Sequence, residues 1–268
     1  MERYSKKSPK QNNRREIKTP QRELDENTVV GRNALKELLA SERDIEKIFV
    51  KKGELEGSLV QLVGIAKERK IPVLEVDKQR LDSLSCGINN QGVVAIASER
   101  NYSSVEDILA YAEEKGEKPF VIVLDGVEDP HNLGAIIRSA ECTGAHGVII
   151  PKRRAVGLTG VVERASAGAL EHMRVAKVTN LTSAIEELKK KGLWIFAADM
   201  GGDAYYDTDM TCAAAIVLGS EGFGISRLVK ENCDITVSIP LKGQVNSMNV
   251  SCAAAVILSE VSRQRSSK

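Results

Sequence analysis

Three short segments of the chain combine residue types that could do chemistry. The first holds Asn132, Gly134 and Arg138 within seven residues. The guanidinium of an arginine can stabilise negative charge that develops on an oxygen, or it can form a structural ion pair with a carboxylate such as Asp129. Asn132 could also cap a helix that begins here. This segment alone leaves a catalytic and a structural interpretation of Arg138 open.

The second segment is the glycine-rich stretch Leu-Gly-Ser-Glu-Gly-Phe-Gly at residues 218–224. Glycines let the backbone approach a ligand closely, and backbone amides in such a turn can bind polar groups. The spacing G-x-x-G-x-G differs from the dinucleotide fingerprint G-x-G-x-x-G, and no G-K-[S/T] is present. A dinucleotide-dependent oxidoreductase is therefore disfavoured. A turn without a chemical role is the alternative, but the acidic Glu221 at its centre favours a site.

The third segment, residues 239–255, holds four small polar residues where a helix is expected to start: Asn246, Ser247, Asn249 and Ser251. Capping of the helix would use one or two of them. The excess indicates hydrogen bonding to a ligand.

Each of these segments follows an apolar stretch that predicts a buried strand. The predicted strands are Phe120–Leu124, Gly147–Ile150, Trp194–Ala198, Ala214–Leu218 and Ile235–Ile239, and helices are predicted near 132–142, 181–191, 224–231 and 249–260. Nearly continuous apolar strands that alternate with helices are typical of a parallel sheet covered on both faces. Ligands bind at the carboxyl ends of such strands. We therefore expect the three segments to meet at one edge of the sheet.

The first half of the chain predicts a smaller α/β unit. Its expected helices carry Leu35 and Leu38, Leu62 and Val63, and Leu81, and its strands are 48–50, 73–76 and 93–97. A capping box at Ser103 and Glu106 predicts a further helix behind a polar linker. The predicted organisation is a disordered basic tail (1–27), a small α/β domain (28–98), a linker with a helix (99–118) and a larger α/β domain (119–268).

Composition narrows the function classes. The chain has 268 residues, 42% hydrophobic and 28% charged, which fits a globular protein with a sizeable core. The longest apolar run, 120–124, is too short to span a membrane, and no signal peptide is predicted. The five cysteines are an odd number without a close pair, so we expect a cytoplasmic protein with reduced thiols and no metal site.

The charge is distributed unevenly. Residues 1–22 carry eight Lys or Arg against two Glu, a net charge of +6, which leaves −5 on the remainder because the whole chain has +1. Such a tail could bind a polyanion without sequence specificity, or it could only keep the protein in solution. Charge alone does not favour either interpretation.

Taken together, the three segments resemble the motifs of the SpoU (TrmH-like) family of RNA ribose 2′-O-methyltransferases. The matching stretches are Asn132-x-Gly134-x-x-x-Arg138, residues 218–224, and residues 239–251, in the family's order. The resemblance covers about residues 119–262. Residues 29–97 are similar to the ribosomal-protein-like RNA-binding domain of longer members. Asn90 stands where those members have His before Gln-Gly, and Met248 where Leu is usual.

The resemblance implies a fold and a set of roles. It implies a deep trefoil knot in the C-terminal domain, which the periodicity itself does not predict. It implies that S-adenosylmethionine donates the methyl group. The residues implied in catalysis are Arg138, Asn132, Glu221, Ser247 and Asn249. The residues implied in cofactor binding are Gly219, Ile239, Met248, Ala198, Asp199 and Met200.

The partners follow from the same resemblance. RNA is the expected substrate, with a guanosine of 23S ribosomal RNA favoured and transfer RNA as the alternative. The basic residues Lys152, Arg153, Arg154 and Arg164 could hold RNA phosphates or could form solvated loops. A homodimer through the C-terminal domain is expected, since the last helix, 250–261, is apolar on nearly all faces and needs cover. A catalytically silent RNA-binding protein of the same fold is the rival interpretation.

Overall fold

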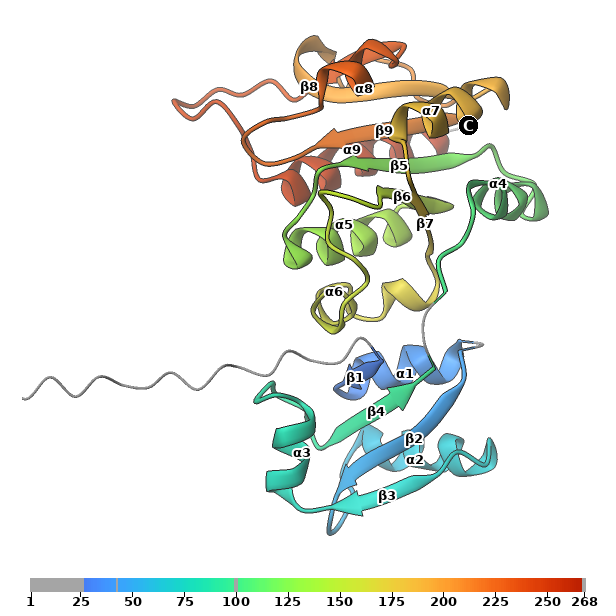
Figure 1. Ribbon diagram of the computed structural model, residues 1–268, viewed down its shortest axis with the longest axis vertical. Coiled ribbons are helices and arrows are strands. Elements are labelled where there is room, and N and C mark those ends of the chain that lie inside the picture. The colour runs from blue at the N-terminus through green and yellow to red at the C-terminus, as the bar shows by residue number, and fades with distance from the viewer. Residues whose placement is uncertain (1–26, 42, 99–100, 267–268) are drawn as a thin grey trace, which may run out of the picture.

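The computed structural model describes residues 27–41, 43–98 and 101–266. The basic tail predicted for residues 1–27 lies outside the described residues except for its last position. The described chain forms two α/β units, one above the other in Figure 1. Each has its own apolar core.

The N-terminal domain is a four-stranded sheet with helices. Its elements are β1 (Thr28–Val30), α1 (Arg32–Ala40), β2 (Ile45–Lys51), α2 (Ser58–Glu68), β3 (Val73–Val76), α3 (Lys78–Leu84) and β4 (Val93–Ala97). The strand order is β1-β4-β2-β3, and only β2 and β3 pair in parallel. Leu35, Leu38 and Leu62 pack into its core, as the periodicity predicts. The sequence missed β1, which is too short to show an alternating pattern.

The C-terminal domain is a six-stranded parallel sheet. Its strands are β5 (Phe120–Asp125), β6 (Gly147–Pro151), β7 (Arg174–Val178), β8 (Trp194–Ala204), β9 (Ala214–Gly219) and β10 (Ile235–Ser238). Its helices are α4 (Val105–Glu114), α5 (Pro130–Cys142), α6 (Gly160–Ala165), the 3₁₀ turn η1 (Ala169–Glu171), α7 (Leu181–Lys190), α8 (Arg227–Glu231) and α9 (Val250–Ser266). The order β10-β8-β9-β5-β6-β7 places three strand ends at the centre of one edge, those of β8, β9 and β5.

Helices cover both faces of this sheet, which confirms the predicted layers. Phe120, Ile122 and Leu124 of β5 enter the core that contains α5 and α9. Val121 and Val123 of the same strand enter the opposite core, with α4, α7 and α8. The alternation explains why the strand is apolar at every position. Figure 1 shows α5 and α9 on one face of the sheet and α7 on the other.

Several predicted boundaries were wrong. The capping box that opens α4 uses Ser104 and Asp107 rather than Ser103 and Glu106, because the Ser103 backbone pairs with β7. The sequence missed β7 and α6, which are short and partly polar. The strand from Trp194 continues to Ala204, since β10 pairs with both halves of it. The trefoil knot stays a prediction of the resemblance.

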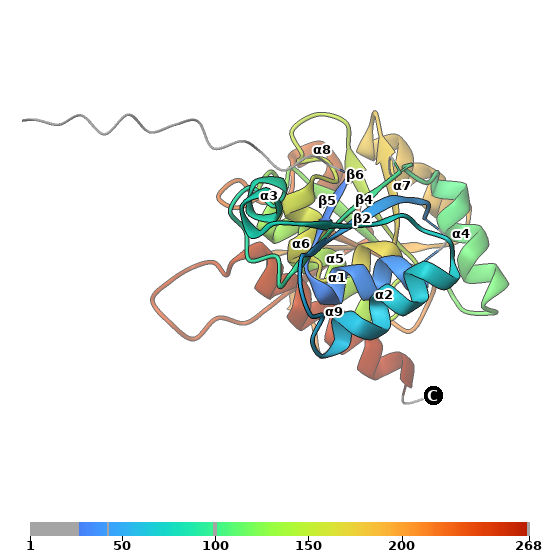
Figure 2. The ribbon, with the colours of Figure 1, turned by 90° about the horizontal axis from the view of Figure 1, so that it is seen from below.

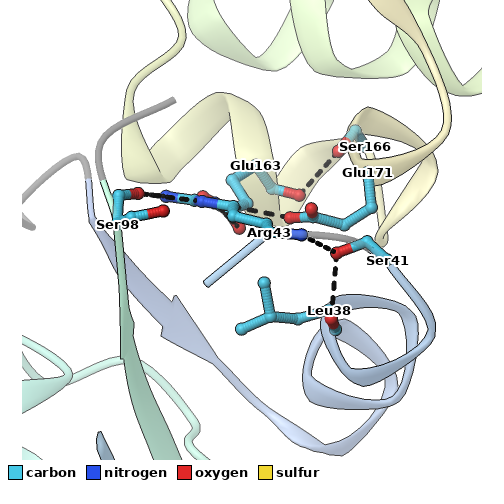
Figure 3. Close-up of polar contacts among 7 residues, drawn as sticks. All are labelled: Leu38, Ser41, Arg43, Ser98, Glu163, Ser166 and Glu171. Carbon is cyan, nitrogen blue, oxygen red and sulfur yellow. Dashed lines mark hydrogen bonds and ion pairs between the residues drawn. The ribbon is translucent and has the colours of Figure 1, made fainter. Parts of the chain in front are cut away.

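The two domains contact each other through α6 and η1. Arg43 of the N-terminal domain donates from Nε and Nη2 to the backbone oxygen of Ser98, at 2.9 and 2.8 Å. Its Nη1 lies 3.2 Å from Glu163 and 3.4 Å from Glu171 of the C-terminal domain, and all three side chains are at most 8% exposed. α6 contacts β1 and η1 contacts α1. Figure 3 shows the buried cluster, and Figure 2 views the molecule from the side of the small domain. The cluster holds the small domain on the large one.

No helix in the described ranges is long and apolar enough to cross a membrane. Among these same residues, no group of three or more His, Cys, Asp or Glu side chains could hold a metal ion.

Candidate active site

Two adjoining clefts open at the carboxyl ends of the C-terminal strands. The first, of about 610 Å³, lies between the middle of β8 and the chain segments after β9 and β10. The second, of about 980 Å³, lies beyond β5, β6, β7 and β9. The glycine-rich turn after β9, residues 220–224, contributes to the walls of both. Ligands generally bind outside the carboxyl ends of the strands of a parallel sheet, and both clefts lie there.

All six residues predicted to bind the cofactor line the first cleft. They are Ala198, Asp199, Met200, Gly219, Ile239 and Met248. They come from β8, from the last residue of β9 and from the segment after β10, and they are up to 50 residues apart in the sequence. The sheet order explains their meeting, because β10, β8 and β9 are neighbours whose carboxyl ends share one edge.

Gly219 has a steric reason to be glycine. A Cβ atom there would lie 2.0 Å from the carbonyl carbon of Gly224 and 2.2 Å from the amide nitrogen of Ile225. The backbone of the returning turn occupies that space, so a side chain would push the turn away from β9. Asp199 is also fixed, since its carboxylate accepts from Lys230 Nζ at 2.6 Å and from the Met200 amide at 2.8 Å.

Asn132, Glu221 and Asn249 form one hydrogen-bonded cluster at the junction of the two clefts. Asn132 Nδ2 donates to Glu221 Oε1 at 3.1 Å, and Asn249 Nδ2 donates to Asn132 Oδ1 at 3.0 Å. Asn249 Nδ2 also donates to Glu221 Oε1. Each of the three predicted segments supplies one member. The cluster therefore locks α5, the glycine-rich turn and the start of α9 together.

Capping of the helices differs in part from the sequence prediction. Asp129, rather than Asn132, caps α5: its carboxylate accepts from the His131 amide at 2.8 Å, and Pro130 follows as the first helical residue. Asn249 Oδ1 accepts from the amides of Ser251 and Cys252 at 3.0 and 3.2 Å. Asn249 thus caps α9 with one end of its amide and binds the cluster with the other.

Arg138 lies away from this cluster. Its side chain is exposed on α5, whereas Asn132 and Gly134 of the same motif are buried. It lines neither cleft, and no hydrogen bond or ion pair joins it to another residue in the described ranges. The structural ion pair with Asp129 is therefore absent. Asn132 and Arg138 point to different sides of α5, since six residues fall well short of two full helical turns.

The remaining polar residues of the third segment face the first cleft. Ser247 and Asn246 line it on an exposed loop, together with Met248, whose side chain is 40% exposed. Ser251 instead donates from Oγ to Asn249 at 2.6 Å. Capping and the cluster thus use Asn249 and Ser251, and the cleft is left with Asn246 and Ser247.

The predicted RNA-binding residues are distributed over two places. Arg153 and Arg154 line the second cleft, on the exposed loop after β6. Lys152 is exposed beside them, whereas Arg164 lies half-buried on α6 and lines neither cleft. In the small domain, Asn90 is buried and binds Asp82 at 2.9 Å. The Asn90 side chain therefore stabilises the turn of the small domain in which it lies.

The sequence analysis missed part of the second cleft. Residues 179–182, which follow β7, line it. The strand itself went unpredicted because charged residues interrupt its apolar pattern, so the loop behind it carried no signal. Lys230, the partner of Asp199, was missed for another reason: an isolated lysine on a short helix has no motif.

Comparisons with known proteins agree with this geometry. Residues 119–259 match the SpoU rRNA methylase family, and residues 28–103 match the RNA 2′-O ribose methyltransferase substrate-binding domain. A Bacillus subtilis (strain 168) protein, YacO, whose name places it among TrmH family tRNA/rRNA methyltransferases, is 44% identical over 238 residues. The match covers 88% of this chain and 95% of YacO. A Staphylococcus haemolyticus protein of the same family name is 42% identical, with 90% and 97% covered.

Solved structures show the same architecture. The SpoU methyltransferase AviRb from Streptomyces viridochromogenes, in complex with its cofactor AdoMet, matches with a TM-score of 0.75 and 25% identity, over 90% of this chain and 91% of AviRb. A crystal structure of an RNA 2′-O ribose methyltransferase matches with a TM-score of 0.73 and 27% identity, over 89% and 88%. The chain is thus a member of the SpoU, or TrmH, family of S-adenosylmethionine-dependent RNA methyltransferases.

Proposed function

We propose that the chain methylates the ribose 2′-hydroxyl of one nucleotide in RNA. The favoured target is a guanosine of 23S ribosomal RNA, and transfer RNA is the alternative. The observation that carries the proposal is the position of the Asn132–Glu221–Asn249 cluster beside a cleft lined by all six expected cofactor residues. The match of residues 28–103 to a 2′-O ribose methyltransferase substrate-binding domain supports the same reaction.

The first cleft fits S-adenosylmethionine. Apolar side chains of the surrounding loops, among them Ile239 and Met248, offer a surface for the adenine ring. Backbone groups of these loops can read its polar edge without special side chains. Gly219 lets the glycine-rich turn pack closely against the end of β9, and Asp199 and Ser247 are polar groups within the same cleft. When bound, the cofactor supplies a methyl group already activated on a positively charged sulfur.

The chain's own residues then have two tasks. The cluster of Asn132, Glu221 and Asn249 fixes the loops that form the cleft, so that methyl group and ribose meet in line. Ser247 and Asn249 lie where they can contact the reacting nucleotide. Arg138 stabilises the negative charge that develops on the 2′-oxygen and grips a neighbouring phosphate, because a guanidinium stays protonated and is a poor base.

Because Arg138 lines neither cleft of its own chain, it can act only in one of two arrangements. Either the bound RNA extends from a cleft to Arg138, or a second copy of the chain places one of its clefts beside Arg138. We propose a homodimer through the C-terminal domain. α5 and α9 pack side by side on one face of the sheet, and Arg138 points outward from α5. The chain itself covers one side of α9, where Ile257 and Leu258 are buried, while Ala253, Ala255 and Val256 are half-buried. Sedimentation as a monomer at micromolar concentration would contradict the dimer.

The function is tested at Arg138. Arg138→Ala should leave the affinity for S-adenosylmethionine nearly intact while the methylation rate falls by about a hundredfold or more. Arg138→Lys should restore little, since lysine keeps the charge but loses the planar fork of donors. Single-turnover methylation of ribosomal RNA from a deletion strain measures the rate, and mapping of 2′-O-methyl groups in that RNA identifies the nucleotide.

A thermal melt of the same variant separates catalysis from folding. If Arg138→Ala is destabilised but its folded fraction methylates at the wild-type rate, the catalytic role is wrong. A cytoplasmic location agrees with an RNA substrate and is part of the proposal.

A further inference from the structure

None of the six expected cofactor residues lines the second cleft, yet it shares a wall with the first cleft. Ser220, Glu221, Phe223 and Gly224 line both. A substrate atom that reaches the methyl group must therefore lie next to this turn. In a nucleotide the base is attached to the ribose carbon next to the one that carries the 2′-hydroxyl. When the hydroxyl is in the first cleft, the base of the same nucleotide lies close to the shared wall.

Phe223 stands at the tip of that wall. Its side chain is 95% exposed, more than any other large hydrophobic side chain in the described ranges. The turn beneath it is closed by two backbone hydrogen bonds of 3.0 Å, from Ser220 N to Gly224 O and from Gly224 N to Ser220 O. Gly222 and Gly224 adopt left-handed φ angles of 90° and 66°, which glycine allows. A closed turn thus presents an aromatic ring that the rest of the chain leaves uncovered.

The charges of the second cleft favour a base over a phosphate. Its lining includes Arg153 and Arg154 but also four carboxylates: Asp125, Glu128, Asp129 and Glu221. Three of these already accept hydrogen bonds, from the amides of Ser226 and His131 and from the asparagine cluster. The surplus of negative charge repels a phosphate inside the cleft. An uncharged ring with N–H donors is better suited, and the exposed Glu128 can accept from it.

We propose that the second cleft receives the base of the methylated nucleotide and that Phe223 stacks on it. The base must leave any helical pairing to enter, so the target nucleotide is unpaired or flipped out. Arg153 and Arg154, both exposed on the loop after β6, then meet phosphates at the rim. Aromatic stacking of this kind contributes about five- to a hundredfold in affinity per base. This inference rests on the proposed ribose methylation in the adjoining cleft.

Three substitutions of Phe223 in the full-length protein test the stacking. Phe223→Ala should lower kcat/KM for ribosomal RNA from a deletion strain by about tenfold or more. Phe223→Leu, which keeps an apolar side chain, should not restore it, whereas Phe223→Trp should. Because Phe223 also lines the first cleft, calorimetric affinity for S-adenosylmethionine is measured for all three variants, and kcat/KM is compared at saturating cofactor. Trp194→Ala is the control, because Trp194 is another exposed aromatic residue but stands at the amino end of β8, at the opposite edge of the sheet.

The possible results separate this proposal from its rivals. Wild-type activity in Phe223→Leu would overturn stacking, as would a wild-type kcat/KM of Phe223→Ala at saturating cofactor. A shift of Phe223→Ala from dimer to monomer in sedimentation would assign the ring to a contact between two copies instead. If the wild-type protein binds cofactor but methylates no RNA ribose, the proposed function fails. The base-stacking contact is then judged by RNA affinity alone, where an equal Kd for wild type and Phe223→Ala overturns it.

Discussion

At the residue scale, burial changes the acid-base behaviour of His146, which lies beneath the sheet edge opposite the clefts. Its side chain is 1% exposed, its Nδ1 accepts from the Phe120 amide at 3.0 Å, and its Nε2 lies 3.1 Å from Glu117. Burial lowers the pKa of His146 below its usual value of 6.5, against a smaller opposing effect of Glu117. The folded chain therefore holds a neutral ring with its proton on Nε2.

This arrangement predicts a pH dependence of stability. Below pH 6.5 the unfolded chain binds a proton at His146 that the folded chain does not bind, so the free energy of unfolding falls as the pH decreases. His146→Asn keeps an acceptor for the Phe120 amide but cannot titrate. We expect thermal melts of this variant to lose less stability between pH 7.5 and 5.5 than wild type. Parallel losses in the two proteins would exclude His146 as the source.

At the element scale, the glycine of the first motif has a packing role. A Cβ atom at Gly134 would lie 2.4 Å from Ala165 Cβ and 2.7 Å from Val162 O, both on α6. α5 and α6 can touch only because this position has no side chain. α6 also carries Glu163, which binds Arg43 of the small domain. Gly134 thus allows α6, the helix that contacts the small domain, to pack closely against α5.

Gly134→Ala should force α5 and α6 apart and lower the free energy of unfolding by about 1–3 kcal/mol. Gly64→Ala is a matched control, because Gly64 is also inside a helix but has open space around its Cβ position. There the substitution should stabilise the protein by up to about 1 kcal/mol. Urea unfolding of the two variants measures both changes. If Gly134→Ala leaves the free energy of unfolding unchanged or raises it, α5 and α6 can move apart without a cost in stability.

At the scale of the whole molecule, the buried Arg43 cluster fixes the position of the small domain against the C-terminal domain (Figure 3). Arg43→Ala removes a cation from beside the buried Glu163 and Glu171. Loss of one partner from a buried ion pair costs up to about 3–5 kcal/mol, because the remaining charges lose part of their compensation. The expected result is a lower melting temperature and a rise in KM for RNA, with cofactor affinity unchanged.

A second substitution tests whether uncompensated charge is the cause. Arg43→Ala combined with Glu163→Gln should recover part of the lost stability. Arg263→Ala is the control, since Arg263 pairs with Glu260 on the surface with its side chain 62% exposed, and such pairs contribute less than about 1 kcal/mol. If Arg43→Ala melts like wild type and binds RNA normally, the cluster does not hold the domains together.

The sequence alone predicted a small and a larger α/β unit, the parallel sheet of the larger one, and the meeting of the three motif segments at one edge of that sheet. The reason is local: β5 is apolar at every position because both of its faces are buried, and the loops behind such strands must meet at one edge. Where the local pattern was weak, as in β1 and β7, the prediction failed. The family resemblance supplied the roles that composition and periodicity could not.

Only the tertiary structure decided which residues touch. Asn132 and Glu221 are 89 residues apart, and Asn132 and Asn249 are 117 apart, yet one hydrogen-bonded cluster joins them. Their contact depends on the strand order, which no local pattern encodes. The same holds for Arg138, whose motif spacing concealed that it faces outward while Asn132 faces the clefts. Long-range packing fixes both the direction in which a helical side chain points and the order of strands in a sheet. A local sequence pattern therefore does not determine either of them.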